Sequence, residues 1–157
     1  MEELEPGALA TDAILVRTLA TQDLDAIVRI DRESMGRSRR EYYEAKVRRA
    51  LDDARLATSL VALIDGHVVG FVLTQLNYGE FGRVEPSAVI DSIGVDPRFR
   101  GRNVGEAMMR QLEMNLRALH VEHLETQVSW SQRELLSFLA DRGFGPAPVI
   151  HLRLDLP

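Results

Sequence analysis

Hydrophobic positions recur along this chain with two periods, one close to two residues and one close to 3.6 residues. Apolar or alternating runs bounded by turn residues predict strands at 14–17, 60–64, 68–76, 89–95, 123–128 and 149–156. Apolar residues spaced three or four apart predict helices over about 21–30, 39–55, 104–119 and 130–142. The resulting order, β-α-α-β-β-β-α-β-α-β, predicts an α/β fold in which helices flank one mixed sheet.

Two of the predicted strand regions have informative patterns. Asp65 and Gly66 separate two apolar runs, and this pair suits the two-residue turn of a β-hairpin. At the end of the chain, Val149, His151, Arg153 and Asp155 alternate with Ile150, Leu152, Leu154 and Leu156. Because neighbouring side chains of a strand point to opposite faces, this pattern predicts a last strand with one apolar face.

The stretch 89–109 carries most of the candidate chemistry. It consists of an apolar strand, a stop at Asp96 and Pro97, a turn rich in arginine and glycine, and an amphipathic helix. The first four N–H groups of a helix have no partner within it, and the helix dipole adds partial positive charge at the same end. The start of this helix is therefore suited to bind a phosphate or pyrophosphate group.

Side chains of the turn reinforce that interpretation. Arg98, Arg100 and Arg102 bring three cations to it, while Gly101 and Gly105 allow a ligand to approach the backbone without meeting a Cβ atom. The turn is thus predicted to bind an anionic cofactor.

The same turn carries a family resemblance. Residues 100–105, Arg-Gly-Arg-Asn-Val-Gly, resemble the Arg/Gln-x-x-Gly-x-Gly/Ala signature of the GNAT family of N-acetyltransferases, with Asn103 in place of the first signature glycine. Asparagine tolerates left-handed backbone angles better than most residues, so the turn is expected to keep its shape. The resemblance implies acetyl-CoA as co-substrate, with its pyrophosphate held by Arg100, Gly101, Arg102, Asn103, Val104 and Gly105.

A second resemblance lies in the region 132–144. Gln132-x-x-Leu135-x-x-Phe138-Leu139-x-x-x-Gly143-Phe144 is similar to the family's Asn-x-x-Ala-x-x-Leu-Tyr-x-x-x-Gly-Phe. The resemblance implies that Gln132 contacts the pantetheine arm, together with backbone groups of Ile93 and Val95. Leu139 stands where many members carry the tyrosine that protonates the departing thiolate, so the usual acid is missing.

The resemblance covers the chain from about residue 13 to its end. We therefore expect a flexible tail at 1–11 and a single GNAT-like domain at 12–157. The family's layout implies that 33–43 and 77–87 surround the acceptor, so Tyr78, Glu80 and Tyr42 are candidate substrate-binding residues.

Acetylation of an amine requires a base, because an alkylamine with a pKa of ~10.4 is mostly protonated at neutral pH. Asp91 in the signature strand and Glu125 in the next predicted strand are the candidate catalytic residues. Strict alternation would put Asp91, Ile93 and Val95 on one side of the sheet. For both carboxylates a purely structural role remains an alternative, and Gln127 is an amide where one common family pattern has glutamate.

Composition limits the remaining possibilities. The chain has 157 residues, no cysteine and a net charge of −5. Without cysteine there is no acyl-cysteine intermediate, which favours direct transfer in a ternary complex. The acidic balance argues against nucleic acid as a partner, and no apolar run has the length of a membrane span. We expect a cytoplasmic protein with no metal site, since its four histidines show no ligand pattern, and a homodimer is possible.

Three functions remain open at this stage, and the least favoured is a generic nucleotide-binding α/β protein, because the chain lacks the full Gly-x-Gly-x-x-Gly or Gly-x-x-x-x-Gly-Lys pattern. The first is an N-acetyltransferase that moves acetyl from acetyl-CoA to a primary amine, which could be a protein lysine, an N-terminus or a small molecule. The alternative is a catalytically weak GNAT-like module that binds or senses acyl-CoA, motivated by the departures at Asn103, Gln127 and Leu139.

Overall fold

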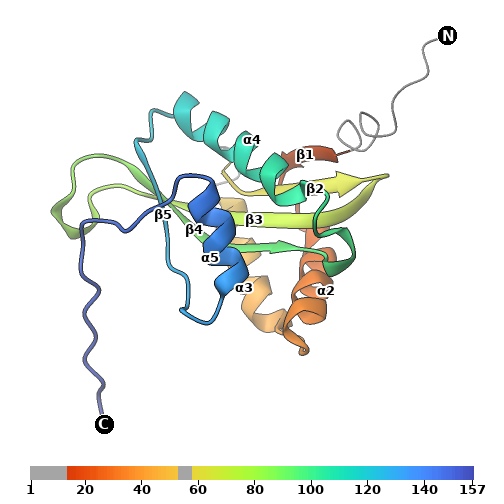
Figure 1. Ribbon diagram of the computed structural model, residues 1–157, viewed down its shortest axis with the longest axis horizontal. Helices are drawn as coiled ribbons and strands as arrows, with labels where there is room; N and C mark the ends of the chain where they lie inside the picture. The colour runs from red at the N-terminus through yellow and green to blue at the C-terminus, as the bar shows by residue number, and fades with distance from the viewer. Residues whose placement is uncertain (1–13, 53–57) are drawn as a thin grey trace.

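The computed structural model describes residues 14–52 and 58–157, and the predicted tail at 1–11 lies outside these ranges. Figure 1 shows a twisted sheet with helices packed on both faces. The strands are β1 (Ile14–Thr18), β2 (Leu60–Ile64), β3 (His67–Asn77), β4 (Ser87–Val95) and β5 (His123–Thr126). The helices are α2 (Leu24–Met35), α3 (Arg40–Asp52), α4 (Val104–Ala118) and α5 (Arg133–Asp141). The predicted α/β class and the order of elements through α5 are confirmed.

The strands follow one another across the sheet in the order β1-β2-β3-β4-β5. All neighbours are antiparallel except β4 and β5, which are parallel and are connected through α4. The predicted hairpin between β2 and β3 is confirmed, since Asp65 and Gly66 form its turn with φ angles of 50° and 77°. Two positive φ angles in succession are what a turn of the primed type requires.

Two apolar clusters cover the two faces of the sheet. On one face α4 buries Met108, Met109 and Leu112, and on the other α2 buries Ile27 and Ile30. These residues are spaced as the helical period requires, so burial of one stripe per helix holds the three layers together.

Gly70 in β3 lets the start of α4 lie directly on the sheet. A Cβ atom at this position would come within 2.8 Å of Val104 Cγ1 and 3.0 Å of Met108 Cε. Real Cβ atoms do not approach other atoms so closely, and the missing side chain therefore sets how near the first turn of α4 comes to β3 and β4.

A β-bulge at Asp91 changes which way β4 presents its side chains. Leu73 of β3 lies opposite Ser92, but its neighbour Thr74 lies opposite Ile90, which leaves Asp91 as the extra residue. The prediction that Asp91, Ile93 and Val95 share one side is wrong. Asp91 pairs with Lys46 of α3, whereas Ile93 and Val95 pack against the cluster under α4.

The parallel strands β4 and β5 pair along only part of their length. Ser87–Ile90 lie opposite His123–Thr126, and β4 then continues to Val95 after β5 has ended. Beyond Ile90 and Thr126 the two strands are therefore no longer paired, and a gap lies between them next to the N-terminus of α4.

The predicted strand at 149–156 is not formed. Residues 142–157 belong to no helix or strand, and Figure 1 shows the end of the chain leaving the body of the fold. A strand pattern produces a strand only when its backbone groups meet a partner, and this segment pairs with no strand among the residues that the structure describes. Across 14–52 and 58–157, no helix combines the length and hydropathy needed to cross a bilayer.

Candidate active site

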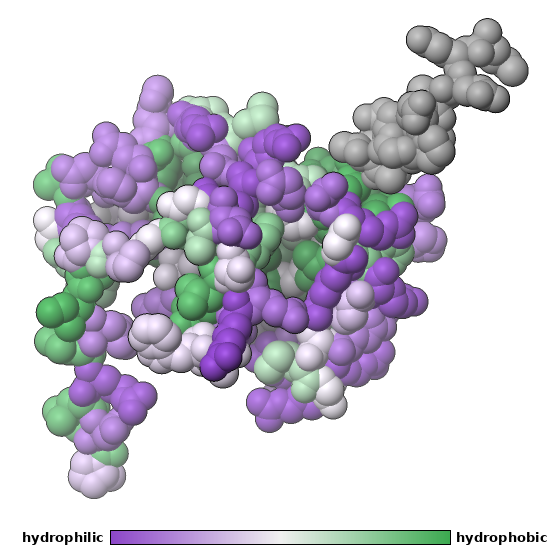
Figure 2. Space-filling model, viewed as in Figure 1, coloured by the Kyte–Doolittle hydropathy of each residue, from purple (hydrophilic) through white to green (hydrophobic). Residues whose placement is uncertain are grey.

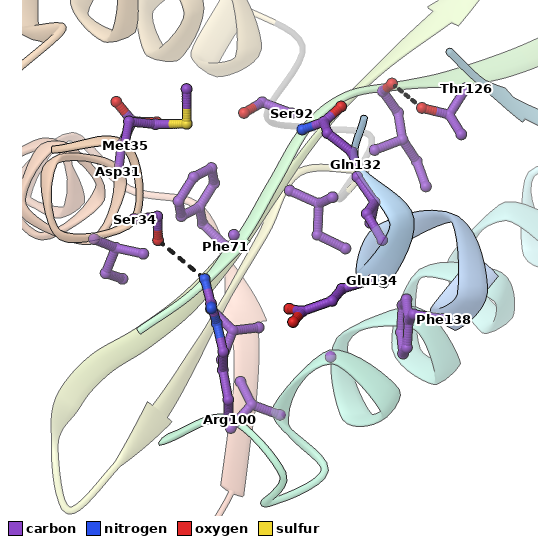
Figure 3. Close-up of a pocket in the computed structure, with 18 of the residues that line it drawn as sticks. Asp31, Ser34, Met35, Phe71, Ser92, Arg100, Thr126, Gln132, Glu134 and Phe138 are labelled. Carbon is purple, nitrogen blue, oxygen red and sulfur yellow. Dashed lines mark hydrogen bonds between the residues drawn. The ribbon is translucent and has the colours of Figure 1, made fainter. Parts of the chain in front are cut away.

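The opening between β4 and β5 leads into a cleft of about 1150 Å³. Its walls come from α2 and α3 on one side and from the start of α4 and α5 on the other, with the end of β4 between them (Figure 3). The signature turn and helices α2 and α3 therefore border one continuous space.

Asp96 anchors the turn that leads from β4 to α4. Its carboxylate is buried and accepts hydrogen bonds from the Arg98 N–H at 3.0 Å, from Arg98 Nη2 at 2.9 Å and from Arg29 Nη1 at 3.0 Å. These bonds, those from Arg98 first, hold the pKa of Asp96 well below its usual range. Because Arg29 belongs to α2, Asp96 ties the start of the turn to the opposite wall of the cleft.

The turn itself has the backbone conformation that the sequence predicted. Gly101 and Asn103 both lie in the left-handed region, with φ angles of 77° and 65°, and Asn103 is the N-cap of α4. The N–H of Ala107 donates to Asn103 O at 3.0 Å, and the amides that precede it come before the first intrahelical bond. Asn103, Val104 and Gly105 all line the cleft, so the start of α4 borders a space large enough for a ligand.

Gly105 has a packing role as well. A Cβ atom here would lie 3.2 Å from the ring of Phe138, which belongs to α5. The glycine therefore allows α5 to pack closely against the first turn of α4, and both residues line the cleft.

Of the three arginines near the turn, Arg100 alone lines the cleft. Arg102, which the sequence analysis placed at the pyrophosphate, lies outside this lining. Arg100 Nη2 lies 3.4 Å from Ser34 Oγ of α2, across the cleft (Figure 3). Arg102 instead stacks on the ring of Phe99 at 5.2 Å, and Arg98 is held by Asp96. Local ion pairs and cation–π contacts thus take up two of the three cations.

The wall formed by α5 holds the second resemblance motif. Gln132 lines the cleft at the N-cap of α5, and its Oε1 accepts the Ser129 N–H at 3.3 Å. Figure 3 shows Glu134 pointing into the same space as the Arg100 side chain. Leu139 is buried at 2% exposure, which makes it a core residue.

The two predicted bases have different surroundings. Asp91 lines the cleft and pairs with Lys46 Nζ at 2.6 Å. Glu125 is outside the lining and pairs with Arg83 Nη1 at 2.8 Å. Gln127, two residues after Glu125 in the chain, lines the cleft. Of the two carboxylates, only Asp91 therefore lines the cleft.

A polar network that joins α2, α3 and β4 was missed by the sequence analysis. The Tyr43 hydroxyl lies 3.1 Å from Asp31 Oδ1 and 3.0 Å from Ser92 Oγ, and Arg39 Nε donates to Asp31 Oδ2 at 2.9 Å. Burial raises the pKa of Tyr43 to about 12, so its phenol stays protonated at neutral pH. The signal was available in the helical pattern, because Asp31 follows Ile27 by one turn on the buried stripe of α2.

The predicted substrate residues are only partly assembled. Tyr42 lines the cleft and packs edge-on against Tyr43, with ring centroids 5.0 Å apart. Tyr78 and Glu80 lie beyond β3, outside the cleft lining, and Tyr78 is largely exposed. Among the described residues, no three His, Asp or Glu side chains are grouped as metal ligands would be.

The fold and the cleft define a class of protein. The sequence pattern of the Acetyltransferase (GNAT) family matches residues 24–144, and the chain belongs to this family. It is 28% identical over 119 residues to an uncharacterised N-acetyltransferase of Methanocaldococcus jannaschii, covering 74% of this chain and 69% of that protein.

Solved structures share the fold at low sequence identity. A transcriptional regulator from Bacillus halodurans C-125 superposes with a TM-score of 0.74 at 16% identity, covering 91% of this chain and 99% of the other. The aminoglycoside N-acetyltransferase AAC(6')-Iy in complex with CoA gives 0.71 at 17% identity, with coverage of 91% and 95%. The ribosomal-protein-S18-alanine N-acetyltransferase from Escherichia coli gives 0.69 at 20% identity, with coverage of 85% and 79%.

Proposed function

We propose that this GNAT protein transfers acetyl from acetyl-CoA to a primary amine, by direct attack while both substrates are bound. The observation that carries the proposal is the continuous cleft between β4 and β5. It joins the exposed amides at the start of α4 to the end of β4, beyond the point where β5 stops. One extended ligand could contact both, with its diphosphate at the helix and its thioester beside the strand.

The residues at the cofactor end suit a diphosphate. Gly101 has open space around its missing side chain, and Asn103 adopts the turn conformation without a glycine. We assign the diphosphate to the amides of 101–105 and to the Arg100 guanidinium, and the pantetheine arm to Gln132 and the backbone of Ile93 and Val95. We give Arg102 a minor role, because it stacks on Phe99 and is itself outside the cleft lining.

In the proposed reaction the neutral amine nitrogen attacks the thioester carbonyl, so a C–N bond forms and the C–S bond breaks. The proton lost by the amine passes to Asp91 or to a water bound to it. The thiolate of CoA leaves with the electron pair of the C–S bond and takes a proton from water. A thiol pKa of ~8.5 makes this leaving group tolerable without an acid, consistent with Leu139 at the tyrosine position.

The acceptor is expected to lie against Tyr42, Ser92 and the Asp31–Tyr43 network. The structural neighbours that carry acetyltransferase names act on acceptors as different as an aminoglycoside and a ribosomal protein. We therefore propose an amine acceptor as a chemical class, with small molecules and protein amines both included.

Two measurements test the proposal. Saturating CoA or acetyl-CoA should raise the melting temperature, because a ligand that binds only the folded state stabilises it. Labelled acetyl-CoA should then label at least one acceptor in a panel of polyamines, aminoglycosides, peptides and lysine-rich proteins. No thermal shift with either thioester or free CoA would refute the proposal.

A second candidate function is an acyl-CoA-binding module with weak catalysis. It is favoured by the buried Leu139 and by Asp91 being already paired with Lys46. Tight CoA binding with no turnover across the whole panel would favour this alternative, and clear turnover on any acceptor would exclude it.

A further inference from the structure

Lysine is almost absent from this chain. Of its 19 lysine and arginine residues, Lys46 alone is a lysine. Figure 2 shows hydrophilic side chains over much of one face of the molecule, and apart from Lys46 the permanently cationic side chains of the protein are all arginines. A guanidinium group stays protonated at neutral pH, whereas the amine of lysine becomes a nucleophile when it loses a proton. Besides its α-amino group, the chain therefore has a single amine that a thioester could acylate.

This single lysine lies beside the proposed base. Lys46 belongs to α3, and its Nζ atom is 2.6 Å from Asp91 Oδ2 at the bulge of β4. A general base must lie within about 2.6–3.2 Å of the group whose proton it takes. The side chain of Lys46 is 23% exposed, so it is largely enclosed by its neighbours. Lys46 thus has the contact with Asp91 that an acceptor amine requires.

The Lys46 amine is also close to the cleft. Nζ lies 5.3 Å from the centre of the Tyr42 ring, and both Tyr42 and Asp91 line the cleft. The thioester is expected beside the end of β4, where Ile93 follows Asp91 by two residues, or about 7 Å of strand. The flexible four-carbon stem of lysine can move Nζ over a comparable distance by changes of rotamer. The amine can therefore reach the proposed thioester without any movement of α3.

We propose that Lys46 is an internal acetyl acceptor, so that the protein acetylates its own Lys46 from bound acetyl-CoA with Asp91 as the base. This inference rests on the proposed function, because it uses the same cleft, the same coenzyme and the same base. It adds a modification site that lies next to the acceptor position.

The reaction removes two protons from the lysine ammonium group. Asp91 takes the first proton and passes it to water, which leaves a neutral amine with a free electron pair. Nζ then attacks the thioester carbonyl carbon, so a C–N bond forms, and the C–S bond breaks as CoA leaves as the thiolate. The second proton, lost by the new amide nitrogen, passes through water to that thiolate. The products are acetylated Lys46 and CoA, and no further reactant is needed.

Acetylation changes the site as well as labelling it. An acetylated Nζ carries no charge, so the ion pair with Asp91 is lost. Asp91 then becomes an unpaired carboxylate beside the cleft, and the local charge becomes more negative by one unit, which favours a cationic acceptor. The paired form is accordingly the resting state of the site, and the acetylated form is the active one.

Mass spectrometry of the full chain tests the self-acetylation. The protein is incubated with acetyl-CoA alone and digested with trypsin, which does not cleave after acetylated lysine, so peptide 41–48 should replace peptide 41–46. The rate constant should be independent of protein concentration, because the transfer occurs within one molecule. Asp91→Asn should slow it about a hundredfold. Gly105→Glu, which is expected to lose CoA affinity, measures the background of chemical acetylation.

The outcomes separate this inference from the proposed function. Acetylated acceptors in the panel together with an unmodified Lys46 would overturn the inference and leave the proposed function intact. No thermal shift with CoA would overturn both. Acetylation of Lys46 in Gly105→Glu at the native rate would also overturn the inference, because the reaction would then not need the cleft. A rate constant proportional to protein concentration would overturn the transfer within one molecule.

Two substitutions of Lys46 test the release of Asp91. Lys46→Arg keeps a cation beside the carboxylate and cannot be acetylated, whereas Lys46→Gln carries a neutral amide as acetyl-lysine does. Both new residues favour helices, so α3 should be retained, and the melting temperature of each variant checks this. The kcat/KM for an external amine should be about fivefold higher in the glutamine variant than in the arginine variant, as expected for loss of a partly exposed ion pair. Equal values in the two variants would overturn the release.

Discussion

The two walls of the cleft are built in different ways. The wall at the start of α4 presents backbone amides in a turn whose shape depends on Gly101 and Asn103. The wall formed by α2, α3 and β4 presents side chains that are already paired with one another, among them Asp31 with Arg39 and Asp91 with Lys46. The wall at the start of α4 therefore depends on backbone conformation, and the opposite wall depends on the identity of its side chains.

This contrast explains why the signature tolerates a departure. A backbone site needs particular φ angles, and asparagine supplies one of them at 65° where the family usually has glycine. A side-chain site has no such freedom, because replacing one partner leaves the other unpaired in a partly buried place. Substitutions at the two walls should therefore differ in their effects on CoA affinity, activity and stability.

The largest effect is expected for Gly105→Glu. It introduces a carboxylate beside the proposed diphosphate, and two like charges 4 Å apart at an effective dielectric of 20 repel by about 4 kcal/mol. CoA affinity should fall about a thousandfold by calorimetric titration. Gly105→Ala is the control, because its Cβ atom meets only the Phe138 ring, at 3.2 Å. Equal CoA affinity in the glutamate variant and the native protein would remove the turn from the site.

The second-largest effect is expected at the wall formed by α2, α3 and β4. Asp91→Asn should lower kcat/KM about a hundredfold, the usual contribution of a general base, while CoA affinity stays unchanged. Glu125→Gln is the matched control and should cost no more than about threefold, because its partner Arg83 forms a half-exposed pair. If the two variants lose equal activity, Asp91 is not the base.

Asp96→Asn tests the anchor that links the two walls. Removing a buried charged acceptor should lower the free energy of unfolding by about 2 kcal/mol at neutral pH, and Arg98 and Arg29 are exposed enough to find water instead. The folded pKa of Asp96 lies below its unfolded value of about 3.9, so its stabilisation is complete above that pH and is lost as the pH falls further. Denaturation curves should show the difference between native and variant proteins shrinking below about pH 4. A difference independent of pH would contradict this role.

The smallest effect is expected at Asn103. Valine at a φ angle of 65° should destabilise the protein by about 1 kcal/mol and weaken CoA binding by roughly tenfold. Asn103→Gly should leave both unchanged or slightly improved. Thermal unfolding with and without CoA measures both quantities, and an equal loss in the glycine variant would mean that the asparagine side chain itself binds the ligand.

Local patterns in the sequence were enough for much of the fold. The Asp65-Gly66 hairpin and the apolar stripe of α4 were predicted correctly, because turn chemistry and helical period depend on residues near one another in the chain. The conformation of Asn103 was predicted for the same reason.

The sequence analysis failed where contacts between residues distant in the chain determine the local structure. Alternation put Asp91 beside Ile93, but the pairing of β3 with β4 inserts a bulge there. Which arginine faces the cleft is a similar case, because Arg100 reaches Ser34 of α2 across it. Asp31 and Ser92 were overlooked because they meet through Tyr43 of a third element.

By itself, the sequence determined the class of fold, the family and the turn at 100–105, since each follows from short-range spacing and backbone preference. The tertiary structure alone decided which carboxylate reaches the cleft, which arginine faces it and whether 149–156 finds a partner strand. Those outcomes depend on strand register and on contacts between separate elements, and the free energy of such contacts exists only once the chain has packed.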